Sequence, residues 1–130
     1  MNIDSHLKGI KESIDEVENA IKIGITTRQR TIGFHTAAAD IFEIILHKEN
    51  LITPSEIVKH EWFASKNKIK EKFNFDFKDK DEIIELIIYI EQERNKLCYG
   101  KQQPEEVIFK VINNFNKLKQ KFEDLGYGKL

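Results

Sequence analysis

The stretch from Glu93 to Lys101, ERNKLCYGK, combines residue types that can bind phosphate esters. Arg94 supplies a planar cation that suits bidentate contacts with phosphate oxygens, Asn95 can donate and accept hydrogen bonds, and Tyr99 adds a phenol. At about 100° per residue, Arg94 projects within about 20° of Ile83 and so lies on an apolar stripe of its helix. An unpaired guanidinium buried there would cost several kcal/mol or more. The sequence therefore predicts that Arg94 meets an anion, a group of carbonyl acceptors or a wet cleft.

A carboxylate within the chain is the alternative partner for Arg94. Glu91 stands about one helical turn earlier, and Asp40 belongs to another predicted helix. An ion pair with either acid would make Arg94 a structural tie between helices. From the sequence, the phosphate interpretation and the ion-pair interpretation both stay open.

Three further side chains are candidates for the same site. Arg30 and His35 lie in TTRQRTIGFH, where they could line an RNA cleft and His35 could serve as a general base. The alternative is that Arg30 is solvated and His35 packs against the helix that carries Arg94. His60, in KHEW, could reach Arg94 across the bundle. A zinc site of the HExxH type is not predicted, because position 64 is Ala64, and no metal or other cofactor is expected.

Apolar residues recur at alternating spacings of three and four, which is typical of amphipathic helices. The predicted helices run from Ile3 to a cap at Gly24, from a cap at Thr26 or Thr27 to about Lys48, from Thr53 through Phe73, from about Lys80 to Tyr99 with a stop at Gly100, and from Pro104 to Leu125. The third helix has the sharpest start signal, a capping box of Thr53 and Glu56 with Pro54 as the first helical residue. Long amphipathic helices with short links predict an all-α fold, a five-helix antiparallel, up-and-down bundle.

Length and composition favour one soluble domain covering residues 1–130. The 15.3 kDa chain is 40% hydrophobic and 33% charged, and its formal net charge of −1 argues against capture of nucleic acid or an anionic membrane by the whole surface. The polar start MNIDSHLKGIKES gives no expectation of a secretory signal, and no apolar run approaches the length of a membrane span. The single cysteine, Cys98, fits a reducing interior. We therefore expect a cytoplasmic protein.

Arg-Asn, a few further residues, an aromatic polar side chain and a glycine, in the penultimate long helix of a five-helix chain, resemble the HEPN superfamily. Its signature is Arg, four to six variable residues and then His, often with Asn directly after the Arg. Arg94 and Asn95 match the opening residues, and Tyr99 stands where the commonest spacing puts the histidine. The resemblance implies a helical bundle that pairs as a homodimer. It also implies metal-independent RNA cleavage, in which the arginine stabilises charge on the phosphate and the histidine moves protons.

The chain departs from that signature at the histidine. No histidine follows His60, and a phenol is a poor general base near neutral pH, so Tyr99 is predicted to donate a hydrogen bond or stack on a base. We therefore expect an RNA- or nucleotide-binding domain with a degenerate ribonuclease site. Two alternatives stay open. One is a non-catalytic interaction module that pairs with a minimal nucleotidyltransferase as toxin and antitoxin do. The other is an active endoribonuclease that uses Tyr99 or another histidine.

Overall fold

The computed structural model describes residues 3–23, 28–36, 38–53, 55–64, 66–72, 76–99 and 101–128. Its helices are α1 (Ile3–Ile23), α2 (Arg28–His35), α3 (Ala38–Lys48), the 3₁₀ helix η1 (His60–Ala64), α4 (Lys66–Lys72), α5 (Lys80–Tyr99) and α6 (Glu105–Asp124). These ranges contain no β-strand, so the all-α prediction is confirmed. In the same ranges, no helix combines the length and the apolar character that crossing a membrane requires.

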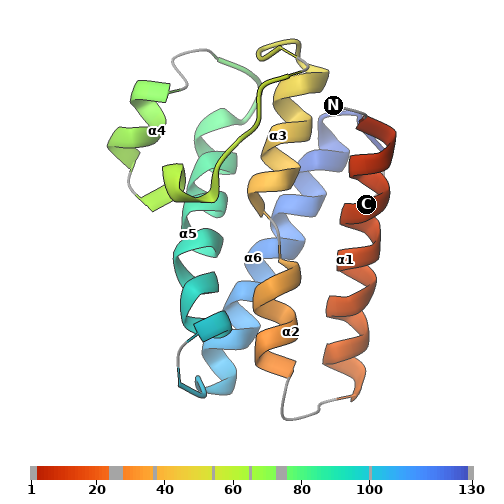
Figure 1. Cartoon of the computed structure of the whole chain (residues 1–130), viewed down its shortest axis with the longest axis vertical. Helices are drawn as coiled ribbons and strands as arrows, with labels where there is room; N and C mark the ends of the chain where they lie inside the picture. The colour runs from red at the N-terminus through yellow and green to blue at the C-terminus, as the bar shows by residue number, and fades with distance from the viewer. Residues whose placement is uncertain are drawn as a thin grey trace.

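The helices form a bundle in which α5 packs against both α2 and α6 (Figure 1). α2 also packs against α1, and α3 extends the line of α2 toward the other end of the bundle (Figure 1). η1 lies on α5, and the short α4 packs against η1. α2 and α5 therefore meet at one end of the bundle, while α3, η1 and α5 meet at the other.

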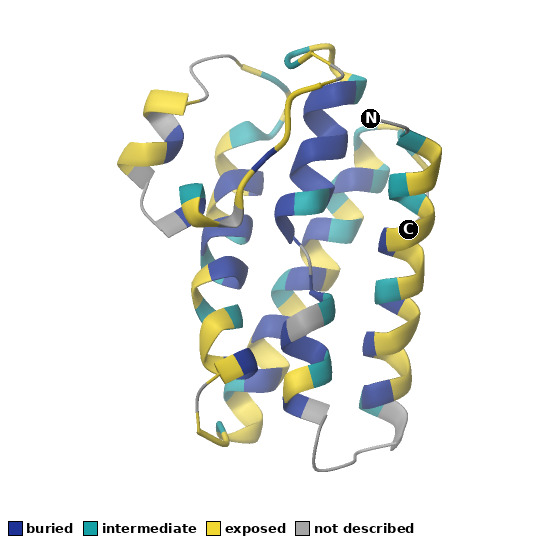
Figure 2. Cartoon of the chain, viewed as in Figure 1, coloured by how far each residue is buried: buried dark blue, intermediate teal, exposed yellow. Residues whose placement is uncertain are grey.

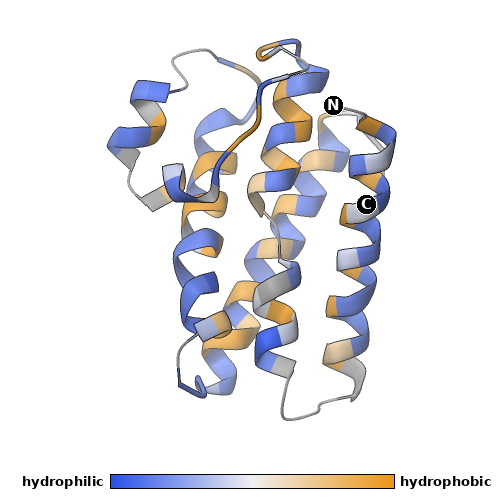
Figure 3. Cartoon of the chain, in the orientation of Figure 1, coloured by the Kyte–Doolittle hydropathy of each residue, from blue (hydrophilic) through white to orange (hydrophobic). Residues whose placement is uncertain are grey.

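The three longest helices, α1, α5 and α6, follow the predicted apolar stripes. Figure 2 shows their buried sides turned inward, and Figure 3 shows that these sides are the apolar ones. α5 has the predicted bounds, whereas α6 begins one residue later than predicted because Pro104 is its N-cap. The predicted caps at Gly24, Thr26, Thr27 and Gly100 lie outside the described residues.

The prediction of one continuous helix ending near Lys48 is wrong. The helix is interrupted between α2, which ends at His35, and α3, which begins at Ala38. The Thr36 hydroxyl donates to the carbonyl of Ile32 at 2.8 Å, and the N–H of Ala39 donates to Glu91 Oε1 at 3.0 Å. In a continuous helix the Ala39 N–H would donate to the carbonyl of His35. The carboxylate of Glu91 therefore replaces a helical acceptor and satisfies the first turn of α3.

The predicted helix from Thr53 through Phe73 is also wrong. Half of the capping box forms, since the Thr53 N–H donates to Glu56 Oε1 at 2.9 Å, but residues 55–59 are not helical. The N–H of Val58 donates instead to Glu43 Oε1 of α3, at 2.7 Å. This tertiary hydrogen bond takes the donor that a helix would have used, so helical structure resumes only at η1. Pro54 and Phe73 lie outside the described residues.

Two clusters of buried apolar side chains make up the core. The first joins α3, η1 and α4 to one half of α1, α5 and α6, and includes Ile14, Ile90 and Phe115. The second lies at the α2 end and includes Val17 and Leu97. Along α5, the boundary between the clusters falls between Ile90 and Leu97. Arg94 falls at that boundary.

Candidate phosphate-binding site

Arg94 lies at the boundary between the two apolar clusters. Its residue neighbours in the helical stripe, Ile90 and Leu97, are fully buried, whereas Arg94 is half-buried. Its Nε atom, which is part of the guanidinium group, is shielded from solvent.

Glu91 and Asp40, the two acids considered as partners of Arg94, differ in their surroundings. Glu91 is only 7% exposed and accepts the Ala39 N–H described above. Asp40 is half-buried and forms no ion pair within the described part of the chain. Within the described residues, Arg94 and Asp40 therefore form no ion pair. The carboxylate of Glu91 accepts the N–H of Ala39, where the helix is interrupted between α2 and α3.

Asn95 and Tyr99 are exposed on α5, next to Arg94 in sequence. Tyr99 is 78% exposed, which is unusual for a large ring at the end of a packed helix. A phenol in this position can stack on a nucleobase or donate a hydrogen bond to a phosphate.

Arg30, on α2, comes to the same outer face as Tyr99. α2 and α5 run antiparallel and touch where Gly33 meets Cys98. Arg30 lies about 60° around α2 from Gly33, and Tyr99 lies about 100° around α5 from Cys98, in the same rotational sense. Because the helices are antiparallel, these offsets carry both side chains to one face, where Arg30 is exposed.

Gln29 and Gly33 hold α2 against the end of α5, and the sequence interpretation missed both. Gln29 is 4% exposed, donates through Nε2 to the carbonyls of Leu97 at 3.4 Å and Lys101 at 3.1 Å, and accepts the Gln103 N–H at 2.6 Å. A Cβ on Gly33 would lie 2.8 Å from Leu97 Cβ. A glycine inside a helical apolar stretch was the available signal for this close approach, but nothing local distinguished Gln29.

Cys98 lies between the charges of the site. Burial raises the pKa of its thiol, the nearby Arg94 opposes that shift, and Glu91 reinforces it. The thiol therefore stays protonated at neutral pH, and Cys98, which is 4% exposed, serves as a small packing residue.

The two candidate histidines have different placements. His35 lies about 200° around α2 from Gly33, and its Nδ1 is 3.3 Å from Ser13 Oγ of α1. It therefore contacts α1 rather than the helix that carries Arg94. His60 begins η1, and its side chain lies outside the described part of the chain. Over the described residues, no group of three or more His, Cys, Asp or Glu side chains is arranged to hold a metal ion.

Arg30, Asn95 and Tyr99 are exposed near the contact between α2 and the end of α5, whereas Arg94 lies about 140° around α5 from Tyr99. Lys101, just beyond α5, is exposed and adds a further cation. These groups suit an anion with an attached planar ring. Comparison with protein-family models, curated proteins and solved structures finds no match.

Proposed function

We propose that this chain is a HEPN-like domain, with the five-helix up-and-down arrangement of that superfamily, that binds single-stranded RNA. Arg94 and Arg30 would contact the phosphates, Asn95 would donate a hydrogen bond, and Tyr99 would stack on a base. The observation that carries the proposal is the 78% exposure of Tyr99 on the face to which Arg30 of α2 also comes.

The electrostatics of this face support a local binding site. The chain as a whole has a formal net charge of −1, so nonspecific attraction of a polyanion to its entire surface is weak. Arg30 nevertheless comes to the same face as Tyr99, and Lys101 is exposed two residues beyond Tyr99. A few such cations neutralise few phosphates, which predicts short contacts and moderate dependence on salt.

The proposal treats the ribonuclease site as degenerate. Tyr99 stands at the position of the family histidine, and His35 contacts Ser13 of α1. A non-catalytic interaction module is the second candidate function, and a groove of about 500 Å³ between α5 and α6 favours it.

Fluorescence anisotropy with a labelled single-stranded RNA of mixed sequence tests the proposal. We expect Tyr99→Ala to weaken binding by about 1 kcal/mol or more, because base stacking is lost, while the salt slope stays unchanged. Arg30→Ala should weaken binding and lower the slope of log affinity against log salt by about 0.7, because one phosphate contact is lost. Lys8→Ala, an exposed change on α1, should leave both quantities unaltered.

Absence of RNA binding by the folded protein, or equal losses in Tyr99→Ala and Lys8→Ala, would contradict the proposal. A parallel incubation of RNA with protein in the absence of divalent metal addresses catalysis. Intact RNA is expected. Cleavage that disappears in Arg94→Lys, with helical content preserved by circular dichroism, would show an active ribonuclease instead of a degenerate one.

A further inference from the structure

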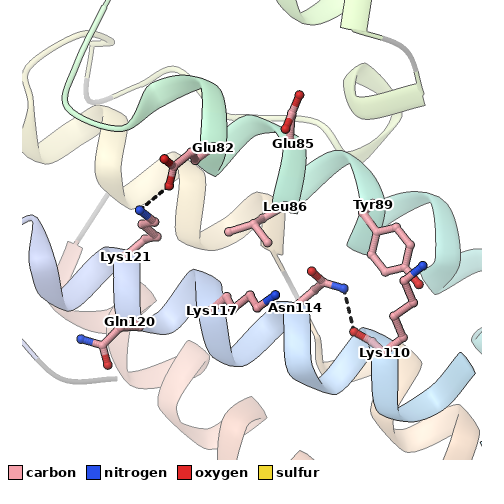
Figure 4. Close-up of a pocket in the computed structure, with 9 residues that line it drawn as sticks. All are labelled: Glu82, Glu85, Leu86, Tyr89, Lys110, Asn114, Lys117, Gln120 and Lys121. Atoms are coloured by element: carbon pink, nitrogen blue, oxygen red, sulfur yellow. Dashed lines mark hydrogen bonds and ion pairs between the residues drawn. The ribbon is translucent and has the colours of Figure 1, made fainter. Parts of the chain in front are cut away.

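The groove between α5 and α6 carries charges of both signs (Figure 4). Its α6 wall includes Lys110, Lys117 and Lys121, and its α5 wall includes Glu82 and Glu85. Three lysines and two glutamates give the groove a formal charge of +1, although the whole chain has a formal net charge of −1. Its volume of about 500 Å³ lies within the range of small-molecule sites, about 300–1,000 Å³. The groove is therefore locally cationic and large enough for a small ligand.

Two of the three lysines are engaged within the chain. At one end of the groove, Lys121 forms ion pairs with Glu82 and, at 3.5 Å, with Asp79 (Figure 4 shows the Glu82 pair). These contacts raise the pKa of Lys121, the side-chain hydrogen bond to Glu82 being the largest cause. At the other end, Lys110 Nζ lies 5.0 Å from the centre of the Tyr89 ring. Contacts between α5 and α6 therefore bridge both ends of the groove.

Lys117, which lies along α6 between these two bridges, is the remaining cation. It is exposed, and within the part of the chain that the structure describes it forms neither an ion pair nor a cation–π contact. The acids of the α5 wall do not neutralise it. Glu82 pairs with Lys121, and Glu85 points away from α6 and already interacts within the chain (Figure 4). The Lys117 ammonium group is therefore available to an external carboxylate.

The groove also presents apolar surface to a ligand. Leu86 is half-buried and points toward α6 (Figure 4), and Tyr89 is half-buried as well. Burial raises the pKa of the Tyr89 phenol, and Glu93 adds to the shift, so the phenol stays neutral and places no negative charge in the groove. The methylene stems of the lining lysines extend the apolar surface. A ligand in the groove therefore meets apolar contacts together with one uncompensated positive charge.

We propose that the groove binds a small amphipathic monocarboxylate, a free molecule with one carboxylate and an apolar body. The carboxylate pairs with Lys117, and the apolar body lies on Leu86 and the Tyr89 ring. One available ammonium group matches one negative charge, whereas a second anionic group on the ligand would meet only lysines that are already engaged. This match of charge and apolar surface is the argument for the class of ligand.

This inference does not depend on the proposed RNA site, since Arg30 and Tyr99 do not line the groove. It assigns the groove to a small molecule, whereas an interaction module would use the same surface for a protein. A bound carboxylate and a bound protein would compete for the groove. Binding of a small carboxylate therefore distinguishes the two uses.

Titration of the isotope-labelled full chain with octanoate, to about 10 mM and followed through the backbone amide NMR signals, measures binding residue by residue. Octanol and octylamine serve as the neutral and cationic analogues. We expect octanoate to shift the signals of Leu86, Asn114 and Lys117 and to bind more tightly than octylamine. Lys117→Met should weaken octanoate about threefold or more and leave octanol unchanged, because only the carboxylate loses a partner. Leu86→Asn should weaken octanoate and octanol by similar factors, because both lose apolar contact.

Lys117→Glu should reverse the preference, so that octylamine binds more tightly than octanoate. Lys8→Met, which removes an exposed charge from α1, is the matched control and should leave the affinity for octanoate unchanged. Circular dichroism should show that all the variants fold. Groove signals that do not shift with octanoate would overturn the proposal and leave this surface to a protein partner. Equal affinities of the wild type for octanoate and octylamine, or equal weakening of octanoate in Lys117→Met and Lys8→Met, would overturn it as well.

Discussion

The two ends of the bundle each use one buried polar side chain to hold a connecting segment, but the chemistry of the two differs. At one end, Glu43 of α3 accepts the Val58 N–H through Oε1, and its Oε2 lies 3.3 Å from His6 Nε2. At the other end, the neutral Gln29 holds Lys101 and Gln103, which lie between α5 and α6. Glu43 and Gln29 are similarly buried, at 5% and 4% exposure.

A buried neutral amide can hold a nonhelical segment with a smaller loss of hydration free energy than a buried carboxylate. Gln29 carries no charge, and both its amide oxygen and its amide nitrogen bind backbone groups. The carboxylate of Glu43 loses more hydration on burial, so each oxygen requires a partner. The strap, residues 51–53 and 55–59, therefore depends on a charged clamp, and the α5–α6 connection depends on a neutral one.

Removing the two clamps should give the largest contrast. Glu43→Ala leaves the Val58 N–H without its acceptor and His6 without its carboxylate, which should lower the free energy of unfolding by about 3 kcal/mol. Gln29→Ala should cost less, about 1–2 kcal/mol, because only neutral groups lose partners. Urea denaturation followed by circular dichroism measures both changes.

Glu12→Ala and Gln102→Ala, at exposed positions, are the matched controls and should lie within about 0.5 kcal/mol of the wild type. Equal losses for Glu43→Ala and Gln29→Ala would remove the distinction between charged and neutral clamps.

A glycine at each end of the bundle gives the next contrast. Gly33→Ala should destabilise the chain by about 2 kcal/mol, because its Cβ would meet Leu97 Cβ at 2.8 Å and the Cys98 backbone nitrogen at 3.1 Å. Gly9→Ala, within α1, meets nothing within 4 Å, and should stabilise the chain by about 0.5–1 kcal/mol through helix propensity. Thermal denaturation distinguishes opposite signs; a stabilising Gly33→Ala would refute the close approach of α2 and α5.

The contributions of the two ends to stability should also depend differently on pH, and these effects should be the smallest of those predicted. The Thr53 backbone hydrogen bond lowers the pKa of Glu56 in the strap. This hydrogen bond therefore stabilises the fold at pH values above the pKa of Glu56 in the unfolded chain, about 4.3. The stabilisation is lost as the pH falls through the lower pKa of Glu56 in the folded chain. Burial raises the pKa of Cys98. The buried thiol therefore contributes its stability at pH values below the pKa of cysteine in the unfolded chain, about 8.5. This stability is lost as the pH rises through the higher pKa of Cys98 in the folded chain.

Melting temperatures of the wild type, Glu56→Gln and Cys98→Ala as a function of pH measure these contributions. The difference between wild type and Glu56→Gln should narrow in acid, and the difference between wild type and Cys98→Ala should narrow in alkali. Differences that do not vary with pH would assign both residues a purely steric role.

The candidate site was predictable in its chemistry and only partly in its geometry. The stretch ERNKLCYGK predicted that Arg94, Asn95 and Tyr99 lie on one helix, and α5, Lys80–Tyr99, contains all three. Residue spacing could not reveal that Arg94 lies between two apolar clusters. It also could not reveal the Gln29 clamp, because its hydrogen bonds join residues separated by about 70 positions.

The all-α class and the extents of α1, α5 and α6 follow from local sequence, because regular apolar spacing over some twenty residues leaves only one helical face to bury. Contacts between distant segments explain why α2 ends at His35 before α3 begins at Ala38, and why residues 55–59 are not helical. In both places a carboxylate from a distant helix, Glu91 or Glu43, accepts a backbone N–H that local helix formation would have used. A short segment gains little from its own helical hydrogen bonds, so a buried acceptor from elsewhere in the fold prevails.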